Sequence, residues 1–214
     1  MKFRTPIEIF RATLLLGVIT CLSGCATTGI DRSEKATTTM QTVADEIDQV
    51  TKQLDDTKAS LDELTRWEQS DVRKAFDTFS ANVVKMDNLE KRFIKHADEM
   101  KARGKEYFAE WKKQGDAYTN PQIRELSEQR REELGIVYGK IAEASIGVKS
   151  AFQAYMSDLK EIQTFLSNDL TQRGISLIMP ITEKVVRDGE DLKNSLIPLQ
   201  AVIDRAKAEM AHQS

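Results

Sequence analysis

Apolar residues recur every seven positions from Met40 onward, and this spacing restricts the fold more than any other feature of the sequence. One row contains Met40, Ile47, Leu54 and Leu61, and the interleaved row contains Val43, Val50, Thr57 and Leu64. Two such rows between charged positions are typical of a helix that buries a narrow seam against a partner helix, as in coiled coils. No segment alternates apolar and polar residues with the period of two that indicates a half-buried strand. The sequence therefore predicts an all-α protein.

Three interruptions divide this pattern into four segments. The first lies near residues 67–71, where the sequence WEQSD shifts the phase of the apolar rows. The second lies near residues 119–121, where Asn followed by Pro supplies a helix cap and a first helical residue. The third lies near residues 171–175, at the end of a long apolar pattern. We expect one helical coiled-coil domain over residues 40–211 that turns at the second interruption.

Two arrangements of the four segments remain open. Folding the chain about the central turn places Phe93 opposite Val148 and, beyond the outer breaks, Val50 opposite Leu192. If the outer breaks are irregularities within continuous helices, the chain is an elongated antiparallel helical hairpin, a rod about 120 Å long. If both breaks reverse the chain, the same segments form a compact four-helix bundle about half that length. The narrow first seam slightly favours the rod, whereas the broader apolar face at residues 175–181 favours a bundle or self-association as a homo-oligomer.

The amino-terminal residues have the layout of a secretory signal peptide. Three basic residues and one acidic residue lie within the first eleven positions, and an apolar run follows over residues 12–21. As a helix this run covers only about 15 Å, half of the ~30 Å that a membrane-spanning helix must cross. We therefore expect residues 1–24 to be a cleaved signal peptide and not a permanent transmembrane helix.

Leu22, Ser23, Gly24 and Cys25 resemble the lipobox that lipoprotein signal peptidase recognises. The resemblance implies cleavage before Cys25 and covalent attachment of several acyl chains, palmitate among them, to this residue. Several chains anchor a protein durably, because each buried methylene contributes about 0.8 kcal/mol. Ala26 stands where aspartate is associated with retention in the inner membrane, so the resemblance implies an outer-membrane anchor that faces the periplasm. The polar, threonine-rich residues 25–39 are expected to form a tether between lipid and helices.

Composition and motifs argue against several functional classes. Loss of Lys2, Arg4, Arg11 and Glu8 with the signal peptide changes the net charge from −3 to −5, so we expect no nucleic-acid partner. The segment GIVYGK at residues 135–140 has the wrong glycine spacing for a phosphate-binding loop. Di-iron sites in helical bundles use two Glu-x-x-His motifs, and this sequence has one, EMAH at residues 209–212. We therefore predict no metal, no cofactor beyond the lipid on Cys25, and no enzymatic activity.

Small residues recur on the third helical segment. They are Gly135, Gly139, Ala144 and Gly147. We expect them to lie opposite the bulky residues of the second segment, because close packing requires a small side chain where its neighbour is large. The bulky residues concerned are Phe93, Met100, Tyr107 and Phe108.

Charge changes sign along the chain. Residues 31–66 contain nine acidic and five basic residues, whereas residues 91–113 contain eight basic and four acidic residues. In the rod, the basic segment lies farthest from the lipid and presents a candidate partner-contact surface, because cations attract an anionic partner and aromatic rings supply contact area. This surface would consist of Lys105, Tyr107, Phe108, Trp111, Lys112 and Lys113. An alternative is that the aromatic residues continue the helical seam and the lysines are merely solvated.

The lipobox, the threonine-rich segment, the acidic heptads and the central sequence YTNPQIRELSEQRREEL together resemble an uncharacterised proteobacterial lipoprotein family, a domain of unknown function. The resemblance extends over nearly the whole chain and implies no known active site. One functional hypothesis is a lipid-anchored rod that presents a binding surface to an envelope protein or to peptidoglycan. The alternative is a periplasmic chaperone-like or regulatory protein that binds in an apolar groove between helices.

Overall fold

The computed structural model describes residues 29–67 and 69–211, which form four long helices. They are α1 (Gly29–Thr65), α2 (Val72–Gly115), α3 (Pro121–Asn168) and α4 (Gln172–Ala211). The described residues contain no strand, so the predicted all-α class is confirmed. None of these helices combines the length and the apolar character that a transmembrane span requires.

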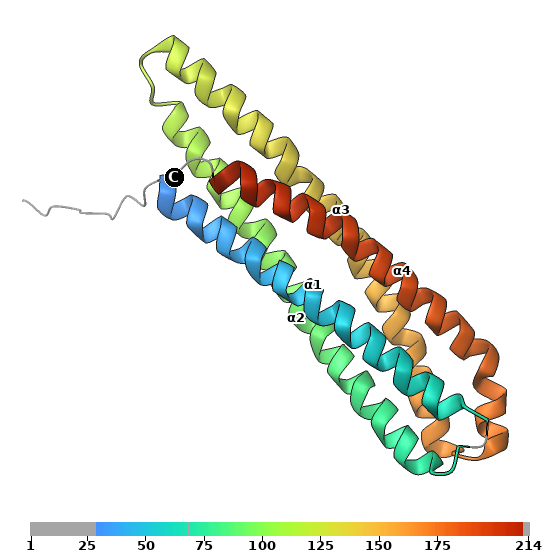
Figure 1. The fold of residues 1–214 in the computed structure, drawn as a ribbon. Coiled ribbons are helices and arrows are strands. Elements are labelled where there is room, and N and C mark those ends of the chain that lie inside the picture. Colours follow the sequence, from blue (N-terminus) through green and yellow to red (C-terminus); the bar gives the residue numbers. More distant parts are fainter. Residues whose placement is uncertain (1–28, 68, 212–214) are drawn as a thin grey trace, which may run out of the picture.

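The helices form an antiparallel bundle in which each helix has two neighbours (Figure 1). Helix α1 packs against α2 and α4, and α3 packs against the same two helices. The chain reverses direction at both outer breaks, so the four-helix bundle forms and the 120 Å rod does not. The chain turns between Gly115 and Pro121, and α2 and α3 pair as a hairpin, with the rings of Phe93 and Phe152 6.1 Å apart.

The physical reason for the bundle is a third buried row on α1. Besides the two apolar rows, α1 buries Glu46, Gln53 and Ser60, which recur every seven residues along the face toward α2. Because this row is polar, the apolar residues of α1 alone predict a buried face too narrow to contact two neighbouring helices. The row is buried because its polar groups find partners, such as the 3.1 Å hydrogen bond from Gln53 Nε2 to Asn82 Oδ1 of α2.

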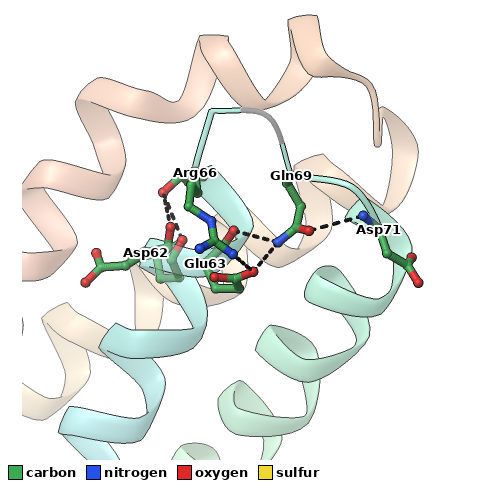
Figure 2. Close-up of polar contacts among 7 residues, drawn as sticks. Asp62, Glu63, Arg66, Gln69 and Asp71 are labelled. Carbon is green, nitrogen blue, oxygen red and sulfur yellow. Dashed lines mark hydrogen bonds and ion pairs between the residues drawn. The ribbon is translucent and has the colours of Figure 1, made fainter.

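The turn between α1 and α2 is fixed by side chains (Figure 2). Gln69 donates from Nε2 to the Glu63 carbonyl oxygen at 3.2 Å, and its Oε1 accepts from the backbone N–H of Asp71 at 3.1 Å. Asp71 then caps α2, because its Oδ1 accepts from the backbone N–H of Lys74 at 3.0 Å. The interruption near residues 67–71 is therefore a built turn and not a local unwinding of one helix.

The other two turns also use side-chain caps. Asn120 Oδ1 accepts from the backbone N–H of Gln122 at 2.9 Å, directly before the proline that begins α3. Thr171 Oγ1 accepts from the backbone N–H of Gly174 at 3.0 Å and donates to Asp169 Oδ1 at 2.7 Å. A Cβ atom at Gly174 would clash with the Asp169 carbonyl oxygen, so only glycine fits at the start of α4.

Helix α1 begins earlier than the sequence pattern predicts. Residues 29–39, expected to be part of a tether, are helical, and Ala36 is fully buried. The threonines fit the helix because their hydroxyls donate to carbonyl oxygens of the preceding turn, as Thr37 does to Ser33 at 2.8 Å. The remainder of the expected tether, the signal peptide, Leu22–Gly24 and Cys25 lie outside the described residues.

Both ends of the helical chain lie at one end of the bundle (Figure 1). The start of α1, the end of α4 and the turn between α2 and α3 share this end, and the α2–α3 hairpin projects past the other two helices. We call residues 111–126 the hairpin tip. The rod would have placed this basic and aromatic segment far from the amino terminus of the helices, whereas the bundle places it beside that terminus.

Candidate functional site

An open groove with a volume of about 690 Å³ lies between α2 and α3. Its lining is mainly apolar and consists of Asp98, Lys101, Ala102, Gly104, Lys105 and Phe108 from α2 and Gly135, Tyr138, Gly139 and Ala142 from α3. A second hollow of about 340 Å³ shares Asp98 and Lys101 with the first and continues to Gln153. From Gly135 to Gln153, α3 rises about 27 Å, so the two hollows form one elongated groove.

The groove is open because Gly135 and Gly139 of α3 have no side chain facing them. A Cβ atom at Gly135, Gly139 or Gly147 would meet no other atom within 4 Å. The prediction that these glycines make room for bulky residues of α2 is therefore wrong. The bulky residues, among them Phe93 and Met100, point into the bundle interior and are almost fully buried there.

Gly104 of α2 plays the packing role that the α3 glycines do not. A Cβ atom at Gly104 would clash with Cε1 of Tyr138, so the tyrosine ring lies directly against the α2 backbone. The Tyr138 hydroxyl donates to the Met100 carbonyl oxygen, and the ring packs edge-on against Phe108 with centroids 5.6 Å apart. Burial raises the pKa of Tyr138 well above its ordinary range, so its hydroxyl stays protonated and remains a donor. These contacts make one end of the groove rigid.

Two lysines border the apolar lining. Lys101 Nζ lies 3.9 Å from Asp98 Oδ1, a loose contact between partly exposed groups. Lys105 is exposed and forms no ion pair with any residue that the structure describes. The groove therefore combines an apolar floor with positive charge at its rim.

The predicted partner-contact residues do not form one surface. Tyr107 is buried, and Trp111 donates from Nε1 to Ser127 Oγ at 3.0 Å, which joins α2 to α3 below the turn. Phe108 and Lys105 line the groove instead. Lys112 and Lys113 are exposed on the hairpin tip. Sequence reasoning did not find Gly139, Tyr138 and Ala142 as groove residues, because heptad spacing does not indicate which face lacks a covering neighbour.

The pair formed by Glu46 and His96 resembles a catalytic arrangement but lies away from the groove. His96 Nδ1 lies 2.8 Å from Glu46 Oε1, and Arg92 Nε lies 3.8 Å from the same oxygen. The pair sits in the interface between α1 and α2, and neither residue lines the α2–α3 groove. The groove itself contains no pairing of a nucleophile with a base among its described lining residues.

The described residues bring together no group of three metal-ligating side chains. Glu209 of the Glu-x-x-His sequence accepts instead from Arg130, whose Nη2 lies 3.4 Å from Glu209 Oε2. His212 lies outside the described residues.

Comparison with known proteins places the whole helical region in one family. The model of a family of proteins of unknown function, DUF2959, matches residues 23–211, which include all four helices. No curated protein and no solved structure matches the chain. The chain therefore belongs to the DUF2959 family of proteins of unknown function.

Proposed function

We propose that this protein is a lipid-anchored binding module of the bacterial cell envelope that holds an amphipathic helix of an envelope protein in the α2–α3 groove. The observation that carries this proposal is the groove itself, which is mainly apolar in its larger hollow and has a mixed polar and apolar lining where it continues to Gln153. Its length of about 27 Å equals about five helical turns. An amphipathic helix that lays its apolar face into such a groove is a common mode of protein recognition.

The floor of the groove favours a helix over a polysaccharide. Gly135 and Gly139 leave the α3 backbone uncovered, so a partner helix can approach more closely than it could over larger side chains. Ile136 and Ile146, both exposed, add apolar surface on the same helix. Sugar chains of peptidoglycan require many hydrogen-bonding groups; the larger hollow offers few, and those of the smaller hollow, such as Ser150 and Gln153, lie at one end of the groove. An envelope protein is therefore the better partner.

The charges at the rim indicate the sign of the charge that the partner should carry. Lys105 is unpaired among the described residues, and Lys101 is only loosely paired with Asp98. An acidic residue on the partner helix would gain a charge contact at each lysine, and these contacts would also speed association. The partner segment is therefore expected to be apolar on one face and acidic at its edges.

The anchor rests on the signal-peptide layout and the lipobox, residues 1–25 of the sequence. The outer membrane, with the bundle in the periplasm, is the proposed location. The bundle replaces the spacer rod as the proposed architecture, and a groove between helices replaces the distal tip as the proposed partner site.

Site-directed photocrosslinking tests the groove in living cells. A photoreactive residue at Ala102, an exposed position in the groove, should give a discrete adduct, whereas one at Ala201, exposed on α4, should not. Gly139→Leu fills the groove and should reduce the adduct at least tenfold. Gly147→Leu is the matched control, because that glycine is equally open but does not line the groove. Equal adducts from Ala102 and Ala201, or an adduct that survives Gly139→Leu, would contradict the proposal.

A further inference from the structure

The hairpin tip extends beyond the rest of the bundle at the end where α1 begins (Figure 1). Arg130 Nη2 donates to the carbonyl oxygen of Glu209 at 3.0 Å, close to the end of α4. The part of α3 before this contact, residues 121–129, rises about 13 Å. The tip therefore projects about 10 Å past the described end of α4. It also extends past the start of α1, where Arg32 Nη2 donates to Gln114 Oε1 of the tip at 2.8 Å (Figure 1).

The distance between the proposed lipid and the bundle is short. Four residue steps separate Cys25 from Gly29, and a fully extended chain of this length spans at most about 14 Å. The headgroup layer of one leaflet is itself about 5–7 Å thick. A lipid on Cys25 would therefore hold the first turn of α1 within about 10 Å of the headgroups, the rise of two helical turns. This step rests on the lipid anchor of the proposed function.

The tip carries the side chains that favour a membrane interface. Ile123 and Leu126 are 49% and 65% exposed, and Tyr118 is exposed beside them. Ile30, in the first turn of α1, is exposed at the same end of the bundle. Aliphatic side chains gain free energy in the boundary between headgroups and acyl chains, and tyrosine is enriched at that depth.

The charges of the tip permit close contact with anionic headgroups. Residues 111–126 contain Lys112, Lys113 and Arg124 against Asp116 and Glu125, which gives a net charge of +1. The turn is also held in shape, because Arg124 Nη2 donates to the Tyr118 carbonyl oxygen at 2.6 Å. A rigid tip loses little conformational freedom on contact, so its apolar side chains can contribute to binding.

We infer that the hairpin tip is a second membrane contact, in which Ile123 and Leu126 enter the lipid interface beside the lipid on Cys25. The lipid and the tip together hold the bundle upright, with the turns at residues 66–71 and 169–171 directed away from the bilayer. Two linked contacts bind more tightly than either alone, because the first raises the effective concentration of the second.

Quenching of tryptophan fluorescence by brominated lipids tests this contact in vesicles of phosphatidylethanolamine and phosphatidylglycerol. Trp67 lies at the opposite end of the bundle and is 80% exposed, so Trp111→Phe leaves a single reporter far from the membrane. Trp67→Phe combined with Leu126→Trp leaves reporters only at the tip. We expect quenching at the tip to be at least threefold stronger than quenching of Trp67.

A pair of charge substitutions separates insertion from mere proximity. Ile123→Glu, added to the tip-reporter variant, should lower its quenching at least twofold, because a carboxylate resists entry into the interface. Ile136→Glu is the control, since Ile136 is also exposed but lies about 20 Å further along α3. Equal quenching at both ends of the bundle, or equal effects of the two substitutions, would overturn the inference.

Failure of the anchor and failure of the tip contact can be distinguished. The protein beginning at Cys25 can be coupled through that thiol to a maleimide-headgroup lipid, which supplies the link without cellular acylation. Tip quenching in this form supports the contact even if mass spectrometry finds no natural acyl chains. Vesicle-bound protein without tip quenching overturns the contact and leaves the lipid anchor unaffected.

Discussion

The imidazole Nδ1 of His96 lies 2.8 Å from the carboxylate Oε1 of Glu46, and only 6% of the Glu46 side chain is exposed. Its Oε1 has partners that make this burial tolerable, whereas its Oε2 is buried without a hydrogen bond among the described residues. The pair thereby helps to fix which face of α1 meets α2.

Replacing His96 should therefore lower the free energy of unfolding by more than an ordinary surface substitution does. His96→Leu leaves Glu46 with only the distant Arg92, so we expect the free energy of unfolding to fall by about 3 kcal/mol. Replacing both members, as in Glu46→Met combined with His96→Leu, should restore most of the loss. Urea denaturation followed by circular dichroism measures both effects, and equal losses in the single and double variants would contradict this account.

Two glycines of the α2–α3 hairpin should respond to alanine in opposite directions. Gly104→Ala places a methyl group against the buried Tyr138 ring, so we expect a loss of about 1–3 kcal/mol from overpacking. Gly139→Ala meets no neighbour, so the helix propensity of alanine should stabilise the protein by up to about 1 kcal/mol. Thermal melting should show a lower midpoint for the first variant and a higher one for the second. Stabilisation by both substitutions would show that Tyr138 does not pack on Gly104.

Stability should decline in alkaline solution because of buried tyrosines. Burial raises the pKa of Tyr155 in the folded state, even though a hydrogen bond with Thr57 partly offsets the effect. Above pH ~10 the unfolded chain loses this proton while the folded chain keeps it, so the free energy of unfolding falls as pH rises. Each such tyrosine contributes up to about 1.4 kcal/mol per pH unit.

Tyr155→Phe is the variant that isolates this contribution. It should reduce the slope of stability against pH between about pH 10 and 11, relative to the unmodified protein. The comparison variant is Tyr118→Phe, which removes the same hydroxyl from an exposed residue of the hairpin tip. Urea midpoints at a series of alkaline pH values give the slopes, and an unaltered slope in Tyr155→Phe would refute the assignment.

The proposed anchor predicts a specific chemical difference at the amino terminus. Cys25→Ser should abolish incorporation of labelled palmitate and leave the first twenty-four residues attached. Ala26→Asp should preserve acylation but move the protein from the outer to the inner membrane fraction. Mass spectrometry of the amino-terminal peptide and membrane fractionation measure these outcomes. An unacylated wild-type protein would remove the basis for the anchor.

The sequence predicts the helices well because their boundaries have local causes. The Asn120 cap followed by proline and the apolar rows of α2 and α3 depend on neighbouring residues, which a single sequence reveals. The choice between rod and bundle depends instead on Glu46 and Gln53, whose burial requires partners on α2. A polar residue in a heptad looks solvated until that partner is known, so the bundle could be offered only as the alternative.

The α2–α3 groove could not be predicted from the sequence for a similar reason. Gly104 and Gly139 look equivalent in the sequence, yet one lies against the Tyr138 ring and the other faces open space. Tyr138 and Gly139 are adjacent, and one residue corresponds to a rotation of about 100° around the helix. A small error in the predicted rotation of α3 about its axis therefore makes an exposed glycine such as Gly139 look packed.

The even number of helices has a practical consequence for labelling. Because α4 returns to the end where α1 begins, a fluorescent protein fused after α4 would be crowded against the bilayer if Cys25 carries lipid. An epitope inserted at the turn beside Ser70 would instead stand about 70 Å away, the length of the 48-residue helix α3. That turn is the position from which a tag would report on the periplasmic interior without disturbing either the groove or the hairpin tip.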